Sequence, residues 1–100
     1  MYRSLRICSG GGGYEAVPHP ALRLNLDRVR RTLEAEGIAV VDARVMLLAA
    51  TDPEATISRS GRILFKTRDA AAATRAFERL RALLGLPGTE AAGERGRATG

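Results

Sequence analysis

Two stretches of the chain place apolar residues at helical spacing. In the first, Leu26, Val29 and Leu33 follow at i, i+3 and i+7 and form one apolar stripe. Arg30 and Glu34 lie four residues apart on this predicted helix and can form an ion pair. The second stretch repeats apolar residues at i, i+4, i+7 and i+11, namely Ala73, Phe77, Leu80 and Leu84. Both patterns predict amphipathic helices with one buried face.

Capping residues border both predicted helices. Asn25 and Asp69 precede them, and a short polar side chain at that position accepts hydrogen bonds from the first backbone N–H groups. Gly37 and Gly85 follow them and can adopt the left-handed conformation that ends a helix. We therefore expect one helix from near Asn25 to Gly37 and a second from Asp69 to Gly85.

Alternating apolar and polar residues predict strands elsewhere. In residues 2–8, Leu5 and Ile7 alternate with polar positions, which indicates a first strand. Residues 38–50 are rich in Val, Ile, Leu and Ala, and they predict one long strand or two short ones. The second half of this stretch is apolar on both faces and is predicted to be a central strand. Residues 14–21, with two prolines, are expected to be a connection.

Residues 55–67 predict a β-hairpin. The segments 55–59 and 62–67 flank Ser60-Gly61, and glycine tolerates the positive φ that a tight hairpin turn requires. In a two-residue turn, Arg59 and Arg62 would lie directly opposite each other, with Lys66 on the same face. A four-residue turn would shift the register, so both registers remain open.

The predicted fold is a single α+β domain over residues 1–88. Strand, helix, three strands and helix follow in the order β-α-β-β-β-α, and short connections favour antiparallel neighbours. Two amphipathic helices and one sheet then make a two-layer sandwich, with an antiparallel sheet and both helices on one face. Residues 89–100 contain no apolar side chain larger than alanine and are expected to be a flexible tail.

The composition adds a basic character to this picture. The 100 residues carry 16 Lys and Arg against 11 Asp and Glu, a formal net charge of +5, and Lys66 is the single lysine. The arginine excess can reflect codon usage, ion-pair networks or a surface for phosphate or carboxylate groups, which suit the planar guanidinium.

The densest basic cluster falls on the predicted hairpin. Its residues are the candidate partner-binding residues of the sequence: Arg59, Arg62, Lys66 and Arg68, with Arg44 nearby. A solvated hairpin face is the alternative interpretation. Only 4% of the residues are aromatic, which is few for a base-stacking surface.

The sequence contains few residues for catalysis or metal binding. Cys8 is the single cysteine and His19 the single histidine, so Cys and His alone cannot form a structural zinc site. His19 lies between two prolines and is expected to be an exposed loop residue, while Cys8 is expected to be a structural thiol. The glycine run 10–13 lacks the spacing of a nucleotide-binding loop. We expect no enzyme activity, no cofactor and no metal.

No apolar run approaches the about 20 residues of a membrane helix. The longest, residues 45–50, is six residues long, and the first residues lack the apolar core of a secretory signal. One cysteine cannot form an internal disulfide, which is compatible with a reducing compartment. We therefore expect a cytoplasmic protein without a membrane partner.

Residues 8–85 resemble a known accessory domain. The segments NLDRVRRTLEAEG, VVDARVMLLAA and ATISRSGRILFKTRDAAAATRAFERLRALLG are similar to the small domain that follows the adenylation domain in some ThiF/MoeB/HesA-type enzymes. Those enzymes activate ubiquitin-like sulfur-carrier proteins, so the resemblance implies a partner of that kind. The match includes the pair Gly61-Arg62, but Ser58-Arg59 stands where the family has Phe-Pro. None of the enzyme's nucleotide or zinc motifs is present.

The segment DPEATISRSGRILFKTRDAAAA is also similar to part of a TATA-binding protein repeat. That family bends DNA with phenylalanine side chains beside the hairpin turn. Ser58 occupies one of those positions here, so this resemblance implies a shared fold without the DNA-kinking wedge.

Three functions remain open after the sequence. The leading hypothesis is a non-enzymatic accessory module that docks a protein, either an adenylation enzyme or a sulfur carrier, on its open sheet face or hairpin. The rival is a module similar to TATA-binding protein that contacts nucleic acid through the basic hairpin. The third is a structural homodimer whose sheet faces or edges pair.

Overall fold

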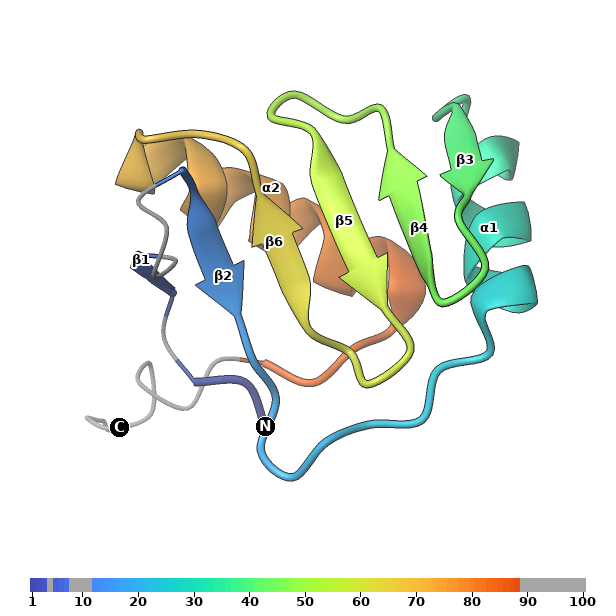
Figure 1. Cartoon of the computed structure of the whole chain (residues 1–100), viewed down its shortest axis with the longest axis horizontal. Helices are drawn as coiled ribbons and strands as arrows, with labels where there is room; N and C mark the ends of the chain where they lie inside the picture. The colour runs from blue at the N-terminus through green and yellow to red at the C-terminus, as the bar shows by residue number, and fades with distance from the viewer. Residues whose placement is uncertain (4, 8–11, 89–100) are drawn as a thin grey trace.

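The computed structural model describes residues 1–3, 5–7 and 12–88. These residues form one antiparallel sheet of six strands in the order β1-β2-β6-β5-β4-β3, with two helices (Figure 1). The strands are β1 (Arg6–Ile7), β2 (Tyr14–Ala16), β3 (Val40–Asp42), β4 (Met46–Ala49), β5 (Ala55–Ser58) and β6 (Ile63–Phe65), and the helices are α1 (Leu26–Ala35) and α2 (Ala70–Leu84). The predicted α+β sandwich is confirmed, with two strands more than expected.

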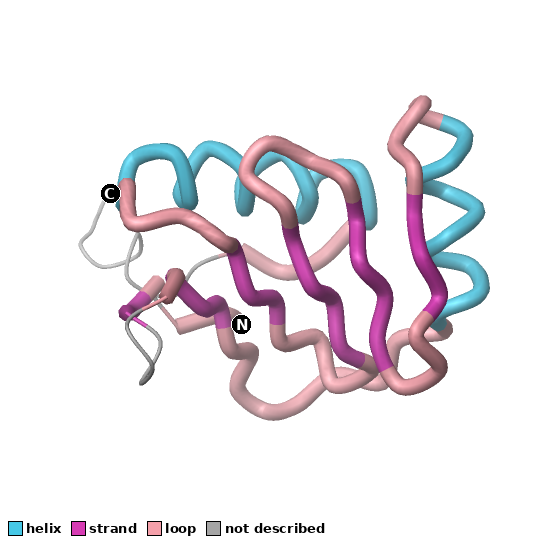
Figure 2. Tube along the Cα trace, turned by 45° about the horizontal axis from the view of Figure 1, so that its top comes forward, coloured by secondary structure: helices cyan, strands magenta, loops and turns pink. Residues whose placement is uncertain are grey.

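Both helices lie on the same side of the sheet. In Figures 1 and 2, α2 crosses behind the strands, while α1 lies beside β3 at one edge. The core fills the space between the helices and the sheet. Every strand except β1 and β3 contributes fully buried side chains to it, namely Ala16, Leu47, Ala49, Ala55, Ile57, Ile63 and Phe65. The helices contribute Leu26, Val29, Leu33, Ala73, Phe77 and Leu80. The opposite side of the sheet carries no layer of the described residues.

Both helices begin where their caps predict; α2 ends at Gly85 as expected, while α1 ends at Ala35, two residues before Gly37 with its φ of 81°. The Asn25 side chain accepts a hydrogen bond from the Arg28 backbone N–H at 3.1 Å, and Asp69 accepts from Ala71 and Ala72 at the start of α2. Gly85 ends α2 in the left-handed conformation, with φ of 68°. The apolar stripes of both helices face the core, as their spacing predicts.

The N-terminal segment differs from the predicted strand and connection. Strand β1 is only two residues long, and the expected connection over 14–21 contains β2, an inner strand paired with β6. The approach of β2 to β6 depends on Gly13, because a Cβ atom there would lie 2.3 Å from the Phe65 carbonyl oxygen. Gly13 thus lies just before β2 and permits two backbone segments to approach closely, a role that residue-by-residue strand propensity does not reveal.

The hairpin is confirmed, but its turn has neither of the two lengths, two or four residues, that the sequence left open. Ala55 pairs with Phe65 and Ile57 with Ile63, and the Ser58 N–H donates to the Arg62 carbonyl at 2.9 Å. Three residues, 59–61, therefore form the turn, with Gly61 at φ of 92°. Because Arg62 lies opposite Ser58, the expected cross-strand contact between two arginines does not form.

Tyr2 anchors the first residues against the core. Its side chain is fully buried, its hydroxyl donates to the Gly61 carbonyl, and its ring meets Phe77 edge-on at 4.9 Å between centroids. Its backbone N–H donates to the Gly88 carbonyl at 2.9 Å. Burial raises the pKa of Tyr2 to about 12. Residue 2 is therefore a core residue and lies outside β1, although the predicted first strand included it.

Candidate functional site

The structure separates the predicted basic residues into two groups. Met46 of β4 pairs with Ser58 of β5, so the turns that carry Arg44 and Arg59 lie at the same end of the sheet. Lys66 and Arg68 follow β6 at the other end, because β6 runs antiparallel to β5. The hairpin therefore presents no single cluster of all five cations.

Two of these cations form ion pairs with nearby carboxylates. Arg62 Nη2 lies 2.7 Å from Glu15 Oε1, and Lys66 Nζ lies 3.2 Å from Glu54 Oε1. Arg6 also binds Glu15, with 2.9 Å between its Nε and Oε2. This arrangement accounts for part of the hairpin's positive charge within the fold.

Glu15 lies on the sheet face opposite the helices, near the edge that β1 forms. Its carboxylate lies between Arg62 and Arg6, and the residue is 9% exposed. The hydrogen bond from Arg62, followed by that from Arg6, lowers the pKa of Glu15 against the opposing effect of burial. Sequence reasoning missed this residue because its strand, β2, was expected to be a connection.

One row of directly opposed residues crosses all six strands on this open face. The row runs Arg6, Glu15, Leu64, Thr56, Leu48 and Val41. Its β1 and β2 members are charged, and its β4 and β3 members are apolar. The face is therefore polar at one edge of the sheet and apolar toward the other.

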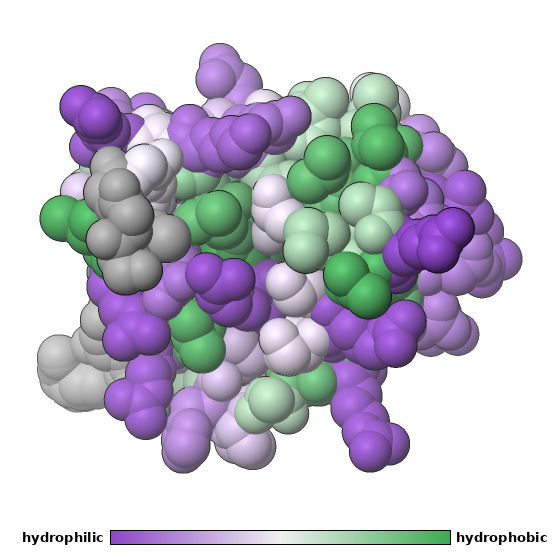
Figure 3. All heavy atoms as spheres, in the orientation of Figure 1, coloured by the Kyte–Doolittle hydropathy of each residue, from purple (hydrophilic) through white to green (hydrophobic). Residues whose placement is uncertain are grey.

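We call the apolar part of this face the open-face patch and define it as Val41, Met46, Leu48 and Leu64. Val41 is 61% exposed, and the other three residues are half-buried. Figure 3 shows hydrophobic atoms gathered on the side of β4 that faces away from the helices. Apolar groups gathered on one sheet face are typical of a surface that a partner covers.

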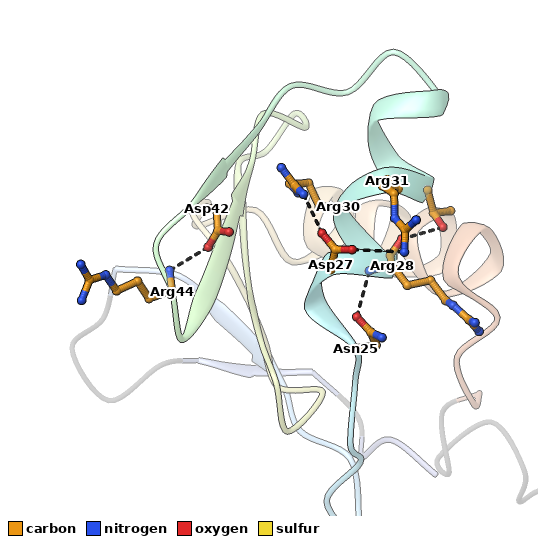
Figure 4. Close-up of polar contacts among 8 residues, drawn as sticks. Asn25, Asp27, Arg28, Arg30, Arg31, Asp42 and Arg44 are labelled. Atoms are coloured by element: carbon orange, nitrogen blue, oxygen red, sulfur yellow. Dashed lines mark hydrogen bonds and ion pairs between the residues drawn. The ribbon is translucent and has the colours of Figure 1, made fainter.

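Arg44 borders the patch at the β3–β4 turn. Its φ is 71°, and its backbone N–H donates to Asp42 Oδ1 at 2.8 Å, so the turn is held by a local side-chain hydrogen bond. Figure 4 shows the Arg44 side chain extending away from α1, toward the open side of the sheet. The turn thus places one guanidinium beside the patch.

A second charged group lies on the helical side. Asp27 Oδ1 and Oδ2 lie 2.6 Å from Arg30 and 3.1 Å from Arg31 (Figure 4). Arg30, followed by Arg31, lowers the pKa of Asp27, and the same contact raises the pKa of Arg30. Arg30 therefore pairs with Asp27 in place of the predicted Glu34. These contacts stabilise the first turns of α1.

Other candidate features give no reactive arrangement. A hollow of about 290 Å³ lies beside β1, lined by Ile7, Gly13, Tyr14, Thr67 and Arg68. Its single ionisable cation has no acid or histidine beside it in that lining. Cys8 and glycines 10 and 11 lie outside the described residues, as does the predicted tail 89–100.

The described part of the chain offers neither a metal cluster nor a membrane-crossing helix. No group of three or more His, Cys, Asp or Glu side chains that could hold a metal ion occurs among residues 1–3, 5–7 and 12–88. Within the same residues, no helix has the length and hydropathy needed to cross a membrane. His19 is exposed in its loop, as expected.

Comparison with known proteins gives no relative for this chain. No family model, curated protein or solved structure matches it.

Proposed function

We propose that this chain is a non-enzymatic interaction module that docks a protein partner on the open face of its sheet. The observation that carries the proposal is the open-face patch, which lies on the side of the sheet away from both helices. Burying these side chains against a partner removes apolar surface from water and favours association. The proposal includes the cytoplasmic location that is expected from the sequence.

The resemblance to the accessory domain supports one class of partner. The segments that carry it correspond to complete elements, namely α1, the neighbouring strands β3 and β4, and the continuous unit of β5, β6 and α2. The proposed partner is accordingly an adenylation enzyme of the ThiF/MoeB/HesA type or its ubiquitin-like sulfur carrier. The module would position such proteins and leave the chemistry to the enzyme.

A binding experiment with purified candidates tests this function. Immobilised wild-type chain is incubated with an adenylation enzyme or a sulfur carrier from the same organism, beside the variants Leu48→Asp and Arg75→Glu. Leu48 lies in the open-face patch, and Arg75 is exposed on α2, on the other side of the sheet. We expect capture by the wild type and Arg75→Glu and loss of capture by Leu48→Asp.

Two other results would contradict the proposal. If Leu48→Asp captures the partner as well as the wild type does, the interface does not lie on the open face. Light scattering could also show a concentration-dependent dimer that Leu48→Asp dissociates. The open-face patch would then bind a second copy of the chain, as in the homodimer considered from the sequence.

A further inference from the structure

We infer that the segment bound on the open face is an acidic amphipathic helix of the partner. This inference rests on the proposed function, and it adds the chemistry and the shape of the bound segment. It follows from the charges that border the open-face patch and from the layer that the sheet lacks on that side.

The bordering charges are mostly positive. Arg6, Arg44 and Arg62 lie on or beside the open face, and Glu15 is the one carboxylate in the row that crosses it. Arg6 and Arg62 share that carboxylate, yet their side chains remain 68% and 43% exposed. Because a guanidinium has five N–H donors, both arginines retain donors for a further carboxylate.

Arg44 supplies the second contact point. The described residues give it no ion pair, and its side chain extends to the open side of the sheet (Figure 4). Three strand spacings separate β6 from β3, which is about 14 Å. A helix rises about 1.5 Å per residue, so carboxylates about nine residues apart would reach Arg62 and Arg44 together.

The apolar side chains between these arginines suit the other face of such a helix. Leu48 and Met46 lie on β4, between the two charged borders, and Leu64 lies on β6, two residues from Arg62. On the far side of the sheet, α2 already crosses the strands with its apolar stripe against them (Figure 2). A partner helix lying across the open face would complete a third layer in the same manner.

The charge of the whole chain favours an acidic partner over a second copy. Each chain carries a formal +5, so two copies face to face would bring cations together around the patch. An acidic partner reverses that repulsion and gains encounter rate and specificity from charge complementarity. A helix with apolar residues on one face and carboxylates at its borders meets both requirements.

Selection from a displayed library of random peptides tests the inference without a presumed partner. The peptides are about 16 residues long, enough for about four helical turns. They are selected on the full chain, and the dissociation constants of the selected peptides are then measured against wild type, Leu48→Asp, Arg44→Glu and Arg75→Glu. Circular dichroism shows whether a peptide becomes helical on binding.

We expect selected peptides rich in Asp and Glu, with apolar residues at helical spacing. Arg44→Glu should weaken their binding about fivefold, and Arg75→Glu, with the same charge change on α2, should not. Leu48→Asp should weaken binding at least about tenfold.

The remaining outcomes separate the two proposals. Neutral or basic peptides that still depend on Leu48 would overturn the acidic helix and retain the docking face. Equal effects of Arg44→Glu and Arg75→Glu would do the same. Failure to select any peptide, or binding that Leu48→Asp leaves intact, would overturn both.

Discussion

At the scale of single residues, Gly13 determines how closely two strands can approach. A Cβ atom at this position would lie 2.3 Å from the Phe65 carbonyl oxygen, a backbone atom that cannot move without separating β2 from β6. Gly13→Ala should therefore lower the free energy of unfolding by about 1–3 kcal/mol, as overpacking does. Urea unfolding measures the loss. Gly12→Ala is the matched control, because a Cβ atom at residue 12 would have no neighbour within 4 Å, and it should stay within about 0.5 kcal/mol of wild type.

Tyr2 links stability to alkaline pH. Burial raises its pKa from 10.0 to about 12, so an unfolded chain loses the phenol proton at lower pH than the folded chain. The contribution of Tyr2 is complete below pH 10.0 and is lost as the pH rises toward about 12. We expect wild-type unfolding free energy, measured in urea, to fall across that interval.

Tyr2→Phe separates this effect from general alkaline denaturation. The variant loses the hydrogen bond to Gly61, at a cost of about 1 kcal/mol near neutral pH, and it should show a shallower decline at high pH. Tyr14→Phe retains Tyr2 and should decline as steeply as wild type. Equal slopes for wild type and Tyr2→Phe would show that the buried phenol is not responsible.

At the scale of secondary-structure elements, Glu15 joins three strands through its two arginine partners. Glu15→Gln removes the charge that Arg6 on β1 and Arg62 beside β6 share, and should cost about 1–2 kcal/mol at neutral pH. The pKa of Glu15 is lowered below 4.5, so its contribution is present above that value and is lost as the pH falls through the folded pKa. The difference between wild type and variant should therefore narrow in acid.

Thermal or urea unfolding between neutral and acidic pH provides that comparison. Glu78→Gln serves as the control, because Glu78 pairs with Arg81 on the exposed surface of α2, where an ion pair contributes little. A gap between wild type and Glu15→Gln that stays constant into acid would contradict the assigned role of the carboxylate.

The elements that sequence reasoning predicted correctly carry local signals. The helices combine an apolar stripe with a cap at each end, and Asn25 and Asp69 make the capping contacts that their side chains favour. The second half of residues 38–50 is apolar on both faces and indeed forms β4, between β3 and β5. These features depend on neighbours within a few residues along the chain.

The features that sequence reasoning missed depend on contacts between residues far apart in the chain. Strand β2 is three residues long, and its pairing of Tyr14 with Phe65 joins segments far apart in sequence. The turn over residues 59–61 is one residue longer than a two-residue turn. That one residue changes the hairpin register, so Arg62 lies opposite Ser58. The candidate site could likewise be predicted only in part. Its arginines were identified from sequence, but Glu15 and the open-face patch require the register of the whole sheet.

At the scale of the whole molecule, the positive charge is spread over two ends of the sheet. Arg44 and Arg59 lie at one end and Lys66 and Arg68 at the other, while Arg62 is paired with Glu15. Affinity for DNA depends on how many phosphates a protein neutralises together. We therefore expect no gel shift of duplex DNA at about 0.15 M salt, the physiological ionic strength. A shift under those conditions, lost in Arg59→Glu, would favour the nucleic-acid hypothesis.

The anchoring of Tyr2 bears on how the protein matures during translation. The contacts of Tyr2 with Gly61, Phe77 and Gly88 join it to residues at least 59 positions further along the chain, which the ribosome adds later. At a synthesis rate of about 5–20 residues per second, several seconds pass between the addition of Tyr2 and that of the residues its ring contacts. The backbone pairing of Tyr2 with Pro18 needs only nearby residues, whereas the contacts of its ring and its backbone N–H are complete only after residue 88 has been added.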